Sequence, residues 1–147
     1  MTAPLPRSHL YVPGNVGPRL DKAWASSADA VVVDLEDAVP VGQKAAARVA
    51  VLEWLASTAV ERAAAGRELW IRVNPGTEGL ADLDALAGAA GVTGLVPAKA
   101  TVPDVRVLAS ELARRGLDWR LSPLLETPGA VLDARVIAGL PLSLIHI

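Results

Sequence analysis

The sequence of 147 residues contains no cysteine, and this absence excludes disulfide bonds, thiolate zinc sites and cysteine nucleophiles. Phenylalanine is also absent and aromatic residues make up only 3% of the chain, so alanine, valine and leucine must fill most of the core. Histidine occurs only at His9 and His146, and neither has a partner at the spacing of metal ligands. His9 begins an apolar run, which favours a structural role.

The chain also lacks strong charge and long apolar runs. Its net charge of −2 gives no electrostatic reason to bind nucleic acid or an anionic membrane. No apolar run reaches the ~20 residues of a membrane span, and none near Met1 is long enough for a signal peptide. With 52% hydrophobic and 20% charged residues, the composition predicts a globular domain, and a cytoplasmic location fits.

Short apolar runs alternate with longer periodic segments along the sequence. The short runs are rich in valine, leucine and isoleucine, as buried strands are, and comprise His9–Val12, Ala30–Leu35, Leu69–Val73, Thr93–Val96 and Leu121–Leu125. The segments between them repeat apolar residues at helical spacing, from about residues 18, 45, 80, 101 and 128 onward. For the second helix the spacing predicts a buried face of Val49, Leu52, Ala56, Ala59, Val60 and Ala63.

Strict alternation of strands and helices predicts an α/β fold with a parallel sheet. Two arrangements of the sheet are compatible with this alternation, an open doubly wound sheet and a (β/α)₈ TIM-type barrel. A barrel usually needs about 250 residues. Five βα units in 147 residues have the number of residues per unit that is typical of a barrel, but the chain is too short to complete one.

Polar residues appear where the predicted strands end. The second run ends at Asp34-Leu-Glu36-Asp37, the third at Arg72-Val-Asn74, the fourth leads into Lys99, and the fifth ends at Glu126. Because side chains alternate along a strand, Leu69, Ile71 and Val73 should face helices, and Trp70, Arg72 and Asn74 should face the other way. In a barrel that second face points inward, and active sites lie at the carboxyl ends of the strands.

Each of these residues also has a structural alternative. Glu36 or Asp37 could cap a helix or lie on the surface, Arg72 could neutralise a buried carboxylate, Glu126 could be a solvated loop acid, and Lys99 fits a structural role. Burying so many charged side chains together at one end of a barrel nevertheless costs free energy unless they form ion pairs or hold a cation. The combined pattern therefore favours a functional site.

Carboxylates without histidine or cysteine form a hard oxygen site, which favours Mg²⁺. A neighbouring guanidinium can bind a substrate carboxylate through two hydrogen bonds and stabilise an enolate oxygen. This pair suits the cleavage or formation of a C–C bond next to a carbonyl. The GxSxG, P-loop and HExxH motifs are absent, and Gly14–Gly17 lacks the third glycine of a dinucleotide fingerprint.

Several motifs, in this order and spacing, resemble the citrate lyase β-subunit and malyl-CoA lyase family, the HpcH/HpaI aldolase group. The resemblance extends from about Arg7 to about Leu140. Its most specific part is the string Asp-Leu-Glu-Asp-Ala-Val over residues 34–39. The supporting motifs are Tyr11-Val-Pro-Gly-Asn15 with Arg19, Lys44 and Arg48 after the second strand, Arg72-Val-Asn74, and Leu124-Leu-Glu-Thr127 followed by Gly129 and Ala130.

The resemblance implies a (β/α)₈ barrel, usually a homo-oligomer, that uses Mg²⁺ to cleave a 3-hydroxyacyl-CoA thioester into an acyl-CoA and a 2-oxo acid. By position, Arg72 would bind substrate as the catalytic arginine that holds the oxo-acid carboxylate. Glu126 would be a catalytic and substrate-binding residue and the magnesium ligand. Glu36 and Asp37 would belong to an acidic patch near the site. Arg19, Lys44 and Arg48 would help to hold the CoA phosphates.

The sequence departs from the family pattern in two places. Pro97-Ala-Lys99 replaces the family's Leu-Pro-Lys, and no acid appears where the next strand should supply a second magnesium ligand. We therefore expect a partial barrel domain over residues 1–140, poorly stable and inactive alone, and a tail over 141–147 that is foreign to the family. Two alternatives remain, a pyruvate-type class II aldolase acting on free hydroxy-oxo acids and a non-catalytic truncated subunit.

Overall fold

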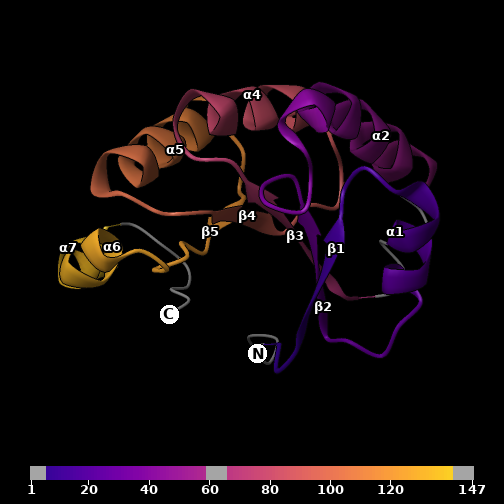
Figure 1. Ribbon diagram of the computed structural model, residues 1–147, viewed down its shortest axis with the longest axis horizontal. Coiled ribbons are helices and arrows are strands. Elements are labelled where there is room, and N and C mark those ends of the chain that lie inside the picture. Colours follow the sequence, from indigo (N-terminus) through magenta and orange to yellow (C-terminus); the bar gives the residue numbers. More distant parts are fainter. Residues whose placement is uncertain (1–5, 59–65, 141–147) are drawn as a thin grey trace.

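A computed structural model describes residues 6–58 and 66–140 of the chain (Figure 1). Strands and helices alternate through this part. Their order and bounds are β1 (His9–Pro13), α1 (Gly17–Trp24), β2 (Ala30–Asp34), the 3-10 helix η1 (Val41–Gln43), α2 (Lys44–Ser57), β3 (Glu68–Val73), α4 (Gly76–Leu86), β4 (Gly94–Pro97), α5 (Val102–Arg114), β5 (Arg120–Leu121), α6 (Pro128–Leu132) and α7 (Ala134–Ala138).

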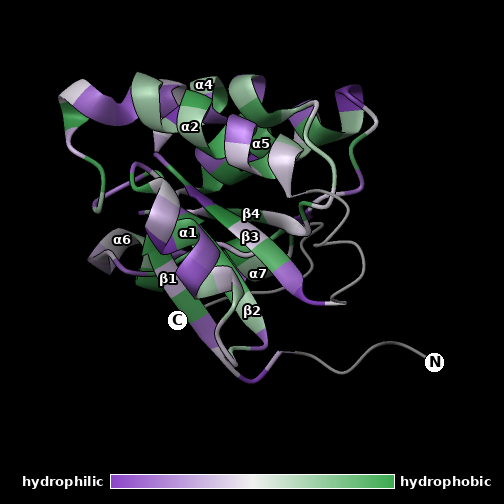
Figure 2. Ribbon diagram, turned by 90° about the vertical axis from the view of Figure 1, so that its right-hand side faces the viewer, coloured by the Kyte–Doolittle hydropathy of each residue, from purple (hydrophilic) through white to green (hydrophobic). Residues whose placement is uncertain are grey.

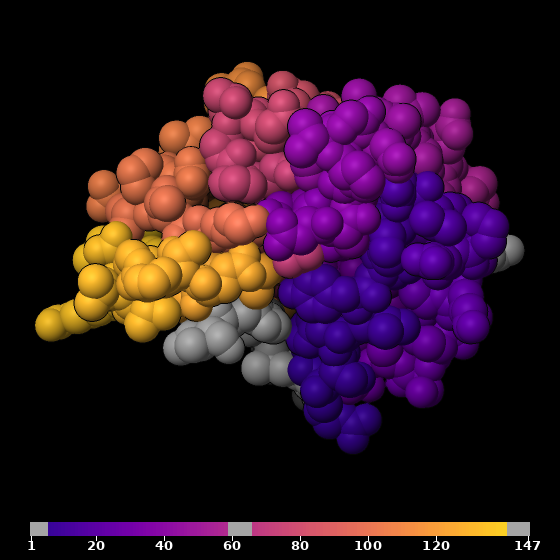
Figure 3. Space-filling view, in the orientation of Figure 1, coloured from indigo at the N-terminus to yellow at the C-terminus, as the bar shows by residue number. Residues whose placement is uncertain are grey.

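The five strands form one parallel sheet in the order β1-β2-β3-β4-β5, the same as their order in the sequence. Helices α1, α2, α4 and α5 follow one another along the outer side of this sheet, as Figure 1 shows. The space-filling view places the segments of β1 and α6–α7 at opposite ends of the inner side (Figure 3). A doubly wound sheet would reverse its strand order and carry helices on both faces, so the arrangement is that of a barrel.

Strand alternation separates the buried residues into two layers. Leu69, Ile71 and Val73 pack outward against the helices in the main core, as the sequence predicts. Ala30, Val32, Trp70, Val96 and Leu124 form a smaller cluster on the inner face. Figure 2 shows the hydrophobic strands beneath α2, α4 and α5, whose outer surfaces carry many hydrophilic residues. The outer layer stabilises the unit, and the inner face carries the polar groups described below.

The predicted buried face of α2 is wrong. Val49 is 56% exposed and Leu52 is 38% exposed, whereas the helix buries Ala47, Val51, Trp54 and Leu55. The segment is apolar nearly all round, so spacing alone does not select a face. The large side chains of Trp54 and Leu55 decide it, because they gain most from burial.

The hydroxyl of Thr101 caps α5, because it accepts a hydrogen bond from the Asp104 N–H at 3.2 Å. Two further elements differ from the prediction. Strand β5 spans Arg120–Leu121 where the sequence predicted Leu121–Leu125, although the N–H groups of Ser122 and Leu124 still donate to the Leu95 and Pro97 carbonyls at 2.9 and 3.0 Å. The single helix expected after Pro128 is divided at Asp133 into α6 and α7.

Some predictions lie outside the described residues. These are the packing of Ala59, Val60 and Ala63 and the nature of residues 141–147. Within residues 6–58 and 66–140, no helix has the length and hydropathy needed to cross a membrane.

We expect Gly94→Ala to destabilise the fold by about 1–3 kcal/mol, because β4 and β5 meet too closely there for a methyl group. An added Cβ would lie 2.2 Å from the Arg120 carbonyl oxygen and 2.7 Å from the Trp70 ring. Urea denaturation measures the change. Gly88→Ala is the control, since nothing lies within 4 Å of its added Cβ. Equal effects of the two substitutions would contradict the described β4–β5 packing.

Candidate functional site

Arg72 and Asp34 form a two-point ion pair at the carboxyl ends of β3 and β2, which lie side by side in register. Arg72 Nε donates to Asp34 Oδ1 at 2.8 Å, and Nη2 donates to Oδ2 at 2.5 Å. The same carboxylate accepts the backbone N–H groups of Glu36, at 2.8 Å, and Ala38, at 3.2 Å. Asp34 is only 2% exposed, so it fixes the guanidinium and the turn after β2 together.

Glu36 and Asp37 follow in that turn and are bound by Lys99, which comes after β4. The Lys99 ammonium donates to Glu36 Oε1, and it lies 3.0 Å from Asp37 Oδ1. Glu36 Oε2 also accepts the Asp37 N–H at 2.8 Å and lies 3.5 Å from Arg72 Nη1. The hydrogen bond from Lys99 lowers the pKa of Asp37 below its usual value, and the bond to Glu36 raises the pKa of Lys99.

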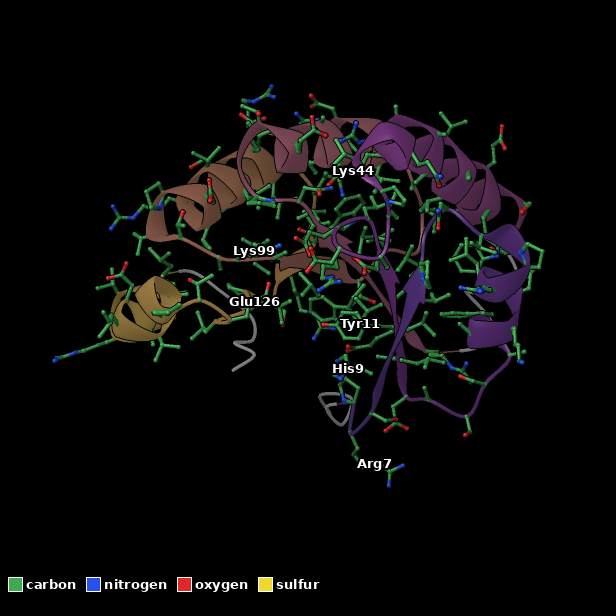
Figure 4. All side chains as sticks on the ribbon, viewed as in Figure 1. Arg7, His9, Tyr11, Lys44, Lys99 and Glu126 are labelled. Atoms are coloured by element: carbon green, nitrogen blue, oxygen red, sulfur yellow. The ribbon has the colours of Figure 1, made fainter. Side chains whose placement is uncertain are left out.

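Glu126, which follows β5, joins this network through the backbone of Lys99. The Lys99 N–H donates to Glu126 Oε1 at 2.9 Å, and the Glu126 side chain is exposed. Figure 4 shows Lys99 and Glu126 close together on the inner side of the sheet, with Tyr11 of β1 nearby. We call this group of Asp34, Glu36, Asp37, Arg72, Lys99 and Glu126 the mouth.

Tyr11 covers one side of the arginine. The Arg72 guanidinium carbon lies 5.4 Å from the centre of the Tyr11 ring, a cation–π distance. Burial is the main cause of a raised pKa for the Tyr11 hydroxyl, and the positive charge of Arg72 opposes it. Arg72 is thus held along one edge by Asp34 and on one face by Tyr11. Its Nη1 side remains directed toward Glu36 within the mouth.

Asn74 departs from the expected position. Its side-chain amide turns outward and donates to the Leu35 carbonyl at 2.9 Å and to Asp82 Oδ2 of α4 at 2.8 Å. Asp82 also accepts the Asn74 N–H at 2.8 Å and Arg48 Nε at 2.7 Å. The expectation that Asn74 shares the inner face with Arg72 is therefore wrong, because the strand has ended and Asp82 offers a buried acceptor.

The three cations suggested for CoA phosphates occupy different surroundings. Lys44 Nζ donates to the carbonyls of Leu35, Glu36 and Val39, at 2.9, 2.9 and 3.2 Å. Arg48 is engaged by Asp82 and Glu78, whereas Arg19 is exposed on α1. Lys44 thus stabilises the turn that carries Glu36. Phosphate binding by these residues stays a prediction.

A cavity of about 400 Å³ lies beside the mouth. Its lining includes Glu36, Asp37, Lys44, Asn74 and Glu78, from the turn after β2 and the start of α4. The mouth therefore has an adjoining space large enough for part of a ligand.

Arg72, Glu126, Glu36 and Asp37, the candidates predicted from the sequence, all lie in the mouth. The contacts that Lys99 makes with three acidic residues and the supporting role of Asp82 were not predicted. The sequence shows Lys99 as a charged residue after the fourth strand, but not the left-handed backbone conformation that it adopts. Asp82 resembles any polar residue on a helix, and only the fold reveals its burial.

Parallel strands in sequential order, with helices outside and acidic and basic groups at the carboxyl ends of the strands, define part of an α/β barrel. The match to known families is more specific. The family model described as HpcH/HpaI aldolase/citrate lyase matches residues 7–143, and the chain belongs to this family.

Curated relatives support the assignment. The chain is 38% identical over 138 residues to a (3S)-malyl-CoA thioesterase of Cereibacter sphaeroides, which covers 92% of this chain and 45% of the relative. It is 33% identical over 144 residues to a citrate lyase subunit beta-like protein of Deinococcus radiodurans, covering 96% and 51%. The chain therefore spans about half the length of the curated relatives it matches.

Solved structures agree. A citrate lyase beta subunit from Mycobacterium tuberculosis, complexed with oxaloacetate and magnesium, superposes with a TM-score of 0.72 at 31% identity, over 90% of this chain and 53% of that one. CitE from the same organism, complexed with magnesium, acetoacetate and coenzyme A, gives 0.69 at 33% identity, over 88% and 43%.

The described residues fit part of a magnesium site. Glu126 is exposed and has one carboxylate oxygen bound by the Lys99 N–H, so its other oxygen is open to a cation. This suits Mg²⁺, which takes one or two protein carboxylates and keeps positions for water and substrate. Within residues 6–58 and 66–140, however, no three histidine, cysteine or acidic residues are grouped to hold a metal. Within this part of the chain, Glu126 is thus the residue that would hold the ion, as one oxygen ligand.

Proposed function

We propose that this chain carries the substrate-carboxylate site and one metal ligand of a magnesium-dependent C–C lyase that acts on 3-hydroxyacyl-CoA thioesters. One observation carries the proposal: the guanidinium of Arg72, fixed by Asp34, and the exposed carboxylate of Glu126 belong to one network, in which Lys99 contacts both Glu126 and the Arg72 partner Glu36. A preorganised guanidinium binds a carboxylate strongly and directionally. The reaction would yield an acyl-CoA and a 2-oxo acid.

The proposed reaction breaks the bond between the α-carbon of the thioester and the carbon that carries the hydroxyl. The hydroxyl loses its proton and becomes the oxo group, and the bonding electrons pass to the thioester as an enolate that takes up a proton. Arg72 holds the carboxylate next to that hydroxyl and so orients the bond that breaks. Bound Mg²⁺ would supply Lewis-acid polarisation of the oxygen on that carbon. Glu126 would hold the ion.

A second candidate is hydrolysis of the same thioester, favoured by the (3S)-malyl-CoA thioesterase at 38% identity. The two reactions use the same substrate and differ in the bond that breaks. Hydrolysis leaves the hydroxy acid intact and releases free CoA.

Product analysis of the complete gene product that contains this chain decides between them. With (3S)-malyl-CoA and Mg²⁺ we expect an acyl-CoA and a 2-oxo acid in equal amounts, and loss of both when EDTA removes the metal. Free CoA with an intact hydroxy acid would establish the thioesterase instead. A 4-hydroxy-2-oxo acid tests the third reading, and cleavage of that free acid without any thioester reaction would identify an aldolase.

A further inference from the structure

Lys44 lies where a lysine is electrostatically unfavourable. It is the first residue of α2, and the first turn of that helix contains no acidic residue. The amino end of a helix carries a partial positive charge, so acidic side chains are favoured there and cations are not. The position of Lys44 therefore costs free energy unless its ammonium finds acceptors outside the helix.

Those acceptors are three backbone carbonyls of the turn after β2. Nζ donates to the carbonyl oxygens of Leu35 and Glu36 at 2.9 Å and to that of Val39 at 3.2 Å. An ammonium has three N–H donors and no acceptor. These contacts are enough to occupy all three donors, which favours a role of Lys44 within the turn over a role in binding phosphate.

The same turn is also bound by Asp34. Its carboxylate accepts the N–H groups of Glu36, at 2.8 Å, and Ala38, at 3.2 Å, and it holds the guanidinium of Arg72. The Leu35 N–H donates to the Arg72 carbonyl at 3.0 Å. The turn thus presents its N–H groups to the carboxylate that fixes Arg72 and its carbonyls to the ammonium of Lys44.

Building on the function proposed above, we infer that Lys44 is a positioning residue for the substrate carboxylate, because its ammonium holds the turn whose N–H groups orient Asp34 and, through it, Arg72. Without the ammonium, three carbonyls lose a charged donor and the turn moves more freely. Asp34 then fixes the guanidinium less well, and a substrate carboxylate binds more weakly. Since Arg72 would hold that carboxylate before and during the reaction, the loss falls mainly on KM.

The first test is Lys44→Met in the complete gene product, which keeps a side chain of similar length and removes its charge. Pyruvate has the carboxylate and oxo group of a 2-oxo acid but no phosphate, so its affinity, measured by calorimetry with Mg²⁺, is independent of any phosphate contact. We expect about 10-fold weaker pyruvate binding, a KM for the thioester raised by a similar factor, and kcat within about 3-fold of wild type.

Arg19→Met is the matched control, because Arg19 is exposed on α1 and should leave pyruvate affinity unchanged. A role of Lys44 in phosphate binding predicts a different pattern, in which the KM for the thioester rises and the affinity for pyruvate stays the same. That pattern would overturn the inference.

Lys44→Ala tests whether the turn needs a cation. Propylammonium replaces the atoms that this substitution removes, and Lys44 lines the cavity of about 400 Å³, which gives a small amine a way in. We expect propylammonium to bring the KM for the thioester to within about 3-fold of wild type, and propanol, which is similar in size but uncharged, to have no effect. Equal effects of the two additives, or none from either, would contradict a cation site.

Hydrogen exchange supplies a readout that needs neither metal nor substrate. In Lys44→Met without Mg²⁺, the N–H groups of Glu36 and Ala38 should exchange at least about 10-fold faster, and in Lys44→Ala propylammonium should slow them again. The Ser122 N–H, which donates to the Leu95 carbonyl, should be unaffected. A wild type that binds no pyruvate removes the proposed carboxylate site, and the exchange rates still decide whether Lys44 holds the turn. Unchanged rates at Glu36 and Ala38 would overturn the inference.

Discussion

Replacing Arg72 by lysine should lower kcat/KM for the thioester about 100-fold, although the charge is kept. Arg72 uses Nε and Nη2 on Asp34, and its Nη1 forms a longer ion pair with Glu36 at 3.5 Å, so the guanidinium can keep Asp34 while Nη1 exchanges Glu36 for a substrate carboxylate. A lysine ammonium is a single point that cannot span both. Steady-state kinetics of the complete gene product with Mg²⁺ measures the loss.

The matched control is Arg106→Lys, an exposed arginine of α5, which should leave kcat/KM unchanged. Thermal unfolding of both variants separates catalysis from folding, because lysine still supplies a positive charge to Asp34. An Arg72→Lys protein that is folded and fully active would remove Arg72 from substrate binding. The proposed reaction would then lose the observation that carries it.

Asp82→Ala should destabilise the protein by about 3–5 kcal/mol, the largest stability effect expected here. Asp82 has 0% exposure and accepts three hydrogen bonds, from Arg48 and from the backbone and side chain of Asn74. Alanine removes the acceptor of the Asn74 N–H and of Arg48 Nε, whose side chain is only 14% exposed, and leaves Glu78 as the remaining acidic partner of Arg48. Urea denaturation followed by circular dichroism gives the change in unfolding free energy.

Asp84→Ala on the same helix is the control. Its carboxylate is 63% exposed and pairs with Arg115 at the surface, so its loss should cost at most about 1 kcal/mol. If Asp82→Ala costs no more than Asp84→Ala, the buried network between α2, β3 and α4 does not support the fold as described.

Much of the fold follows from local sequence. Every predicted strand exists, because β-branched and leucine-rich runs such as Val31–Val33 have no stable alternative to burial between layers. Alternation of faces places Trp70 and Arg72 inside and Ile71 outside. The parallel order follows from the short connections between consecutive elements. These features depend on residues that are near one another in the sequence, so a single sequence is enough to predict them.

The predictions that were wrong concern features that depend on contacts between residues far apart in the sequence. In α2 both candidate faces are apolar, and the packing of Trp54 against α1 decides between them, with its indole N–H on Asp21 at 2.8 Å. The outward turn of Asn74 depends on Asp82, and the mouth depends on Lys99. The positions of the strand ends predict which charged residues lie together. They do not predict which of these residues form ion pairs, because pairing depends on the backbone angles after each strand.

The sequential strand order also bears on how the chain folds during its synthesis. Each strand pairs with the strand made just before it, from β1 with β2 to β4 with β5. Every newly emerged βα unit therefore finds its docking partner already outside the ribosome, and only the length of one unit has to close for each pairing. Asp34 is synthesised before its ion-pair partner Arg72, and Glu36 is synthesised before its partner Lys99. Until β3 and β4 have emerged, the turn after β2 carries uncompensated negative charge and stays hydrated. We therefore expect the ion pairs of the mouth to form only after β3 and β4 have paired with the strands made before them.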